Sequence, residues 1–440
     1  MHTKKWTNEL LDRMRTTGDP LADKAAQALW REQNSRQVVE GLREIARNHR
    51  LQLSGFPQEV ADYFRETEQI AIHPEDQEKF DLAANIFNNY GFRYCALLFF
   101  KALPTGYMCP KPGHVLRSTR LLVDFAARRV METAQFIFAV NNANWHKPGN
   151  PGLEAIQRVR LMHAGMRIAL LNDERPDHRW NMQLGVPINQ EDLALTNHLF
   201  SIAMIDGLDQ MGIHLLADER EAVFHTWQHI GQAMGICPEL YAEDYASGRE
   251  QYRCIFERQC STQNPDGPAL TRALLESLDT MLRSHLPEDS LEDITGYFLD
   301  DPRARKSLGL HPASVGDRVF DAILHFLTSL RVWQRLFHHR NTFAHGSWVS
   351  NMLTSIVARR FGLSSQLSRY PKTGLMSAVS KVLLAELSKR DLHQFESAGG
   401  LNAQKPFFFE NSMLYDAWDL ESFSLDVDSG SSGAAEGAKA

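Results

Sequence analysis

The strongest candidates for a functional site are the ten residues at positions 158–167, RVRLMHAGMR. Their mixture of apolar, small and basic side chains predicts a single helix, in which residues three or four apart share a face. Arg160, His163 and Arg167 then lie in one row, and Gly165 leaves little side-chain bulk beside the imidazole. The pattern offers one metal-ligating nitrogen between two cations.

That arrangement matches what a haem group requires, because an imidazole can bind the iron and guanidinium groups can hold the propionates. The alternative is a hydrogen-bonded core histidine that binds no cofactor. The chain has no C-x-x-C-H motif, so a bound haem would be non-covalent. The residues therefore make haem b a candidate cofactor, while the pattern alone fits the commoner core histidine as well.

A second group of polar residues precedes this helix. Arg129, Glu132, Thr133 and Phe136 stand at positions i, i+3, i+4 and i+7 of a predicted helix over 118–140, so they line one stripe. A cation, an acid, a hydroxyl and an aromatic ring together are too polar for an ordinary core. If the loop at 141–150 joins the two helices as a hairpin, the stripe faces His163. The alternative is an exposed ion pair between Arg129 and Glu132.

The remaining histidines carry weaker signals. His225 and His229 have the i, i+4 spacing of a metal pair, but no glutamate follows the first histidine as it does in H-E-x-x-H. With Trp227 between them, a partly exposed helix face is the better interpretation. His338, His339 and His345 have no carboxylate or cysteine close by in the sequence. The chain also lacks the G-x-S-x-G, phosphate-loop and G-x-G-x-x-G motifs, so hydrolase triads and nucleotide use have no support.

Helical periodicity dominates the elements that must position these residues, and no alternating strand pattern appears, so the predicted fold class is all-α. A strong N-cap is predicted at Asn189 and a rigid turn at 109–113. The predicted helices span 6–50 with a break at 18–20, 56–66, 76–102, 118–140, 151–172, 190–211, 218–235, 269–284, 317–340 and 350–395.

This pattern divides the chain into four parts. We predict an N-terminal helical arm (1–75), a catalytic domain (76–345), a C-terminal helical extension (346–425) and a disordered tail (426–440), whose residues are small and polar.

Composition narrows the functional classes. The 440 residues are 43% hydrophobic and 23% charged, as in a soluble globular protein, and the net charge of −7 argues against nucleic-acid partners. No apolar run reaches membrane-spanning length, and the first residues lack the apolar core of a signal peptide. Five scattered cysteines fit a reducing compartment. A cytoplasmic location is therefore predicted.

An ordered set of motifs resembles a known family, the MpaB and latex-clearing (rubber oxygenase) family of b-type haem oxygenases. The resemblance runs over about residues 80–340. It rests on Arg129 with Glu132 and Thr133, on RVRLMHA at 158–164, on PINQEDLALT at 187–196 with Phe200, and on Trp227 with GQAMGI at 231–236.

The resemblance implies a globin-like helical core that binds haem b, with His163 as the proximal iron ligand. It also implies that Arg160 supports the proximal side, and that Arg129 and Thr133 stand on the distal side. Members of the family use dioxygen to cleave carbon–carbon double bonds in isoprenoid chains.

Two departures from the rubber oxygenases change the expected substrate. Glu132 stands where those enzymes commonly carry a lysine, and the KPGH sequence at 111–114 replaces the region of their acidic base. Polyisoprene is therefore not the expected substrate, and a small apolar, isoprenoid-like molecule is. Glu132 becomes the candidate proton acceptor, with Arg129 and Thr133 as the other catalytic candidates and His114 as the next possible base.

Several alternatives remain open at this point. Glu132 in an ion pair with Arg129 or Arg128 would have no catalytic role. A haem-binding sensor or carrier, and a helical interaction protein without cofactor, are the rival functions. For the favoured hypothesis, a haem-dependent oxygenase, the predicted partners are dioxygen and the apolar substrate.

Overall fold

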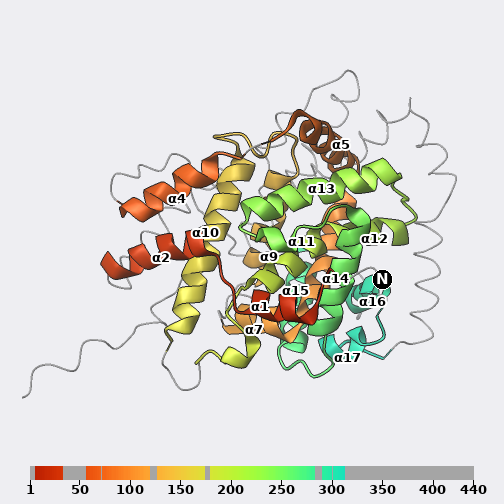
Figure 1. Cartoon of the computed structure of the whole chain (residues 1–440). Helices are drawn as coiled ribbons and strands as arrows, with labels where there is room; N and C mark the ends of the chain where they lie inside the picture. The colour runs from red at the N-terminus through yellow and green to blue at the C-terminus, as the bar shows by residue number, and fades with distance from the viewer. Residues whose placement is uncertain are drawn as a thin grey trace, which may run out of the picture.

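A computed structural model of the protein describes residues 5–32, 56–70, 72–118, 126–173, 179–282, 290–299 and 301–312. Every regular element in these ranges is a helix, which confirms the predicted all-α class (Figure 1). The predictions for 317–340, 350–395, the C-terminal extension and the tail lie outside the described residues. Within the described ranges, no helix is long and apolar enough to cross a membrane.

In its described residues, the N-terminal arm contains α1 (Asn8–Arg15), α2 (Pro20–Glu32) and α4 (Gln58–Glu68). The predicted break at 18–20 is confirmed: α1 ends before Gly18 and α2 begins at Pro20. Figure 1 shows α2 and α4 side by side against the long helix α10 (Pro151–Leu171). Their contact is an apolar cluster that includes Ala22, Ala25, Leu29, Val60, Leu161, Ala164 and Ile168.

The main core is built around a continuous helical rod and the helix that packs along it. The rod comprises α5 (Pro74–Leu97), the π-helical segment η2 (Leu98–Ala102) and α6 (Leu103–Tyr107). Helix α13 (Ala217–Ala233) lies along α5. Buried Lys101 in η2 donates to the side chain of Gln210 at 2.9 Å and to the carbonyl of Phe298 at 2.7 Å. The rod is thereby fixed to the helices beside it.

The other helices complete a single set of packed elements. They are α7 (Pro110–Ser118), α9 (Ala126–Val140), η3 (Met182–Leu184), α11 (Gln190–Phe200), α12 (Ile202–Gln210), η4 (Pro238–Leu240), α14 (Tyr245–Gln259), α15 (Gly267–Leu282), α16 (Ser290–Leu299) and α17 (Ala304–Leu308).

Two sequence predictions are wrong at this level. Residues 109–113 form the start of α7 rather than a rigid turn, because a proline in the first helical turn lacks only an N–H that the helix leaves unpaired. The helix predicted over 190–211 is two helices, α11 and α12, because the backbone turns at Ser201, with φ −114° and ψ −77°.

The predicted hairpin of α9 and α10 is confirmed. The loop between them is closed by Asn142, whose side chain donates to the carbonyl of Ala139 at 2.6 Å and accepts from the side chain of Asn150 at 3.3 Å. Asn150 caps α10 by accepting from the backbone N–H of Gly152 at 2.8 Å. A Cβ at Gly152 would lie 2.6 Å from the Ala139 carbonyl oxygen, so glycine permits the close approach of the two helices.

Candidate functional site

The candidate site lies on α10 and on the helix beside it. Gly152, Ile156, Val159 and His163 follow one another at helical spacing, so they share one face of α10. The N-terminal part of this face packs against the end of α9, where Gly152 meets Ala139 and Trp145. His163 is half-buried on the same face.

On the neighbouring helix α9, one set of residues is buried in the core and another set is only half-buried. Val130, Ala134 and Ile137 are buried in the main core. Glu132, Thr133 and Phe136 are half-buried, and one carboxylate oxygen of Glu132 is shielded from solvent. The Arg129 side chain lies outside the described residues, so its pairing with Glu132 stays a prediction.

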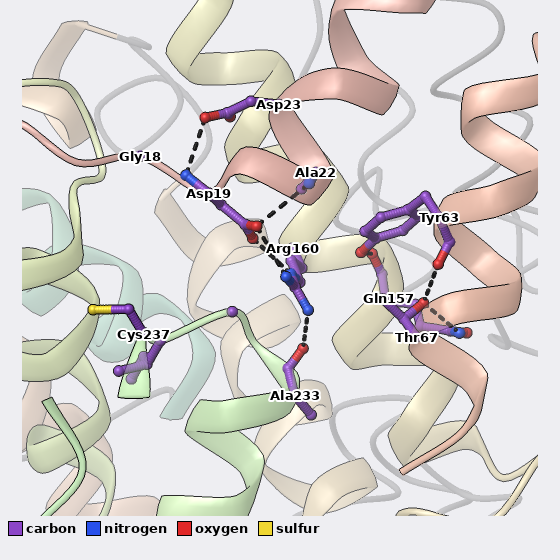
Figure 2. Close-up of polar contacts among 12 residues, drawn as sticks. Gly18, Asp19, Ala22, Asp23, Tyr63, Thr67, Gln157, Arg160, Ala233 and Cys237 are labelled. Atoms are coloured by element: carbon purple, nitrogen blue, oxygen red, sulfur yellow. Dashed lines mark hydrogen bonds and ion pairs between the residues drawn. The ribbon is translucent and has the colours of Figure 1, made fainter. Parts of the chain in front are cut away.

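Arg160 has a partner that the sequence did not reveal. Its guanidinium makes a bidentate ion pair with Asp19, at 2.6 Å from Nε and 2.9 Å from Nη2, and its Nη1 donates to the carbonyl of Ala233 at 3.0 Å (Figure 2). The two side chains are only 12% and 5% exposed. Arg160 therefore joins three elements: the start of α2, α10 and the end of α13.

Arg167, the second cation beside His163, is also occupied. It pairs with Asp23 of α2 and donates to the carbonyl oxygens of Pro187 at 3.0 Å and Ile188 at 2.7 Å. Burial raises the pKa of Asp23 against the opposing charge of Arg167. Both guanidinium groups thus bind oxygen atoms of the chain itself, and their predicted role in holding a cofactor stays a prediction.

The Arg160–Asp19 pair is the centre of a buried polar cluster. Gly235 has a φ of +89°, and a Cβ there would lie 2.3 Å from Asp19 Oδ2 and 2.6 Å from Arg160 Nε. Gln190 donates to the carbonyl oxygens of Gly18 at 2.8 Å and Gly235 at 2.9 Å, and accepts from the backbone of Cys237 at 2.8 Å. The motifs at 187–196 and 231–236 therefore contribute to this cluster.

Helix α4 is also linked to α10 by hydrogen bonds. Figure 2 shows Tyr63, Thr67 and Gln157 together. The Tyr63 hydroxyl donates to the Gln157 carbonyl at 2.6 Å, and the Gln157 amide donates to Thr67 Oγ1 at 2.9 Å. Complete burial raises the pKa of Tyr63, so its hydroxyl stays protonated. Sequence analysis missed Asp19, Tyr63 and Gln190, because their partners are distant in the chain.

His114, the alternative base, lies on α7. Its Nδ1 is 3.1 Å from Asp266 Oδ2, and its ring centroid is 5.4 Å from that of Trp180. The imidazole is 40% exposed and the carboxylate 12%. His114 therefore has a carboxylate partner that orients its ring, and its role as a base stays a prediction.

Comparison with known proteins gives consistent matches. Residues 93–329, more than half of the chain, match the family model described as "ER-bound oxygenase mpaB/B'/Rubber oxygenase, catalytic domain". The rubber oxygenase of Streptomyces sp. (strain K30) is 23% identical over 150 residues, which are 33% of this chain and 36% of the relative. The match therefore spans about a third of that relative's length.

A solved structure shares the fold. The structure of the latex clearing protein LCP in the closed state superimposes with a TM-score of 0.58 at 18% sequence identity. The superposition covers 72% of this chain and 84% of the other. At this identity the likeness concerns the fold alone.

Proposed function

The chain belongs to the family of mpaB and rubber oxygenase catalytic domains, and from this premise we propose that it is a haem b-dependent oxygenase. We propose further that it acts on a small apolar molecule of isoprenoid type and cleaves a carbon–carbon double bond with dioxygen. The observation that supports the site is the pairing of α10, which carries half-buried His163, with α9, which carries half-buried Glu132 and Thr133.

The donor set fits a haem at its iron ligand. A neutral imidazole is the usual proximal ligand, and His163 shares its helix face with the small and apolar residues Gly152, Ile156 and Val159. The two arginines fit the haem propionates less well, because Arg160 and Arg167 already bind Asp19 and Asp23. We therefore assign these two arginines a positioning role: they hold α10, and with it His163, in place.

Bound haem would supply the iron at which dioxygen is activated. The residues of α9 would act on the opposite side from His163. Glu132 would accept or return a proton through its partly shielded carboxylate, and Thr133 would donate a hydrogen bond to a developing negative charge. Phe136 would keep water away, and Arg129 would add positive charge. Addition of dioxygen across a double bond yields two carbonyl groups, so the cleavage needs no further electron donor.

The cofactor part of this proposal is tested by the visible spectrum. We expect full-length protein, purified from haem-supplemented cells, to show a strong Soret band with one haem per chain. His163→Ala should abolish it, because the iron loses its proximal ligand. His214→Ala is the matched control, since His214 is exposed and pairs with Asp209. Full haem content with an unchanged spectrum in His163→Ala would refute the assignment.

The reaction is tested separately. Holoprotein is incubated with linear isoprenoids such as squalene under ¹⁸O₂, and carbonyl products are analysed by mass spectrometry. We expect each new carbonyl to carry one labelled oxygen atom. Reversible oxygen binding without any labelled product would favour the sensor or carrier function instead.

A further inference from the structure

Three metal-ligating side chains meet where the first turn of α5 crosses α13. Asp76 comes from α5, and His225 and His229 come from successive turns of α13. Asp76 Oδ1 is 2.7 Å from His225 Nε2, and Asp76 Oδ2 is 3.6 Å from His229 Nε2. This places a carboxylate between two imidazole rings whose centroids are 4.4 Å apart.

The spacing of the three donor atoms suits one small cation. All three atoms lie within 4.8 Å of one another. A tetrahedral Zn²⁺ with ligands at about 2.0–2.1 Å requires donor atoms about 3.3 Å apart. The observed 2.7 Å and 3.6 Å, each measured from a different oxygen of Asp76, lie on either side of that value. These two separations would change by about 0.6 Å and 0.3 Å on binding.

Hydrogen bonds already orient two of the three residues, His229 and Asp76, as ligands. His229 Nδ1 lies 3.0 Å from the carbonyl oxygen of His225; as the donor there, it leaves the Nε2 lone pair directed at the carboxylate. Asp76 Oδ2 accepts from the backbone N–H of His73 at 3.0 Å, which fixes the carboxylate at the start of α5. Such second partners are characteristic of metal-binding histidines and carboxylates.

The three side chains are largely shielded from water but keep some exposure, so an ion from solution can reach them. The side chains of Asp76, His225 and His229 are 11%, 17% and 13% exposed. The fully buried ring of Phe80 contacts both histidines, with centroid distances of 6.3 Å and 5.3 Å. Low hydration strengthens the attraction between a cation and this carboxylate.

A fourth imidazole lies beside the same phenylalanine. The His146 ring centroid is 5.5 Å from that of Phe80. Within the ranges that the structure describes, its buried Nδ1 atom has no hydrogen-bond partner. A buried nitrogen without a partner is uncommon, and it marks this neighbourhood as one where a polar ligand is still to be supplied.

We propose that Asp76, His225 and His229 bind one divalent first-row transition-metal ion, of which Zn²⁺ is the best probe. Two imidazoles and one carboxylate are a frequent ligand set for such ions, and three protein ligands leave a position for water. The ion would cross-link α5 to α13. The proposed metal ligands lie on α5 and α13, whereas the residues of the proposed haem site lie on α9 and α10.

The test is isothermal titration of chelator-treated, full-length protein with ZnCl₂. We expect saturable binding of a single ion per chain. His225→Ala and His229→Gln should each weaken the Zn²⁺ affinity by about 100-fold or more, because each removes a ligand. His214→Ala is the matched control: it removes a histidine that also pairs with an aspartate, at 3.0 Å, but lies outside the cluster. The Zn²⁺ affinity of the His214→Ala variant should equal that of the unaltered protein.

Thermal unfolding separates a metal site from a simple ion pair. Zn²⁺ should raise the melting temperature of the unaltered protein and of His214→Ala, but not of His229→Gln. His229→Gln is chosen because it leaves the shorter Asp76–His225 contact intact. Absence of saturable binding, or wild-type affinity in a His225→Ala/His229→Gln double variant, would overturn the proposal. Haem content should be unchanged in these variants, so the two proposals fail independently.

Discussion

The ion pair between Asp19 and Arg160 gives the sharpest test of how the arm holds the site-bearing helix. Asp19→Asn removes the charge but keeps an oxygen that can cap α2, where Asp19 Oδ1 now accepts from the backbone of Ala22 at 3.3 Å. The change therefore isolates the ion pair from the helix cap. The guanidinium would retain the Ala233 carbonyl and the face of the Tyr63 ring, 5.9 Å away.

The expected magnitude follows from burial. Removing one partner of a buried, hydrogen-bonded ion pair costs about 3–5 kcal/mol, because the remaining charge is left without compensation. Arg160 keeps 12% exposure and two other contacts, so we place Asp19→Asn at the lower end, about 3 kcal/mol. Arg160→Met alone should cost a similar amount. The double variant should be more stable than the sum of the two losses predicts, by about 2 kcal/mol.

Urea denaturation of the unaltered protein, the two single variants and the double variant measures this coupling. The differences in free energy follow from the denaturation midpoints when the dependence of the free energy on urea concentration is unchanged. Arg65→Met is the control, since Arg65 forms a surface pair with Asp62 on α4 at 2.8 Å with its own side chain 65% exposed. It should leave the midpoint unchanged. Strictly additive losses in the double variant, or an Asp19→Asn midpoint equal to that of Arg65→Met, would refute the reasoning.

Three further predictions concern chemistry, backbone and pH. Glu132→Gln should keep the haem spectrum but lower turnover of an isoprenoid substrate by about 10²–10⁴-fold, as loss of a general acid–base group does; unchanged turnover would remove Glu132 from the mechanism. Gly235→Ala should destabilise the protein by more than about 2 kcal/mol, because it combines left-handed backbone with contacts of 2.3 Å and 2.6 Å on the buried ion pair. Gly149→Ala, also at positive φ but with open space, should show the backbone cost alone in the same denaturation assay. Burial raises the pKa of Asp192 to about 7 from 3.8, so between these values the folded state binds a proton that the unfolded state releases. The free energy of unfolding should therefore fall as the pH rises from about 4 to 7, by at most about 4 kcal/mol. Asp192→Asn should flatten that part of the stability–pH curve, and an unaltered slope would contradict this account.

Local signals in the sequence predicted the elements that carry the candidate site. The α10 helix and the loop before it follow from helical periodicity and loop-forming residues, which act over a few residues. The N-cap at Asn189 is confirmed, since its side chain accepts from the backbone of Asp192. Helix α14 was missed although Asp244 caps it in the same way, by accepting from Ser247 at 2.8 Å. That signal was present in the sequence.

Contacts between distant residues could not be predicted from the same signals. Arg160 and Asp19 are 141 residues apart, and His225 and Asp76 are 149 apart. Residue types indicate that a cation requires an acid, but only the packing of α2 against α10 decides which acid it meets. Local signals therefore place Arg160 and Arg167 beside His163 but do not reveal that both pair with carboxylates of the arm.

The arm has a consequence for what counts as the unit of this fold. The homologous segment begins at residue 93, yet two of its buried guanidinium groups are neutralised by carboxylates from α2. A protein shortened to that segment would lose both carboxylate partners of these arginines and would present the apolar surface of Leu161, Ala164 and Ile168 to water. The segment that matches the family model is thus only part of the packed unit, because the N-terminal arm supplies α10 with both charge partners and apolar surface.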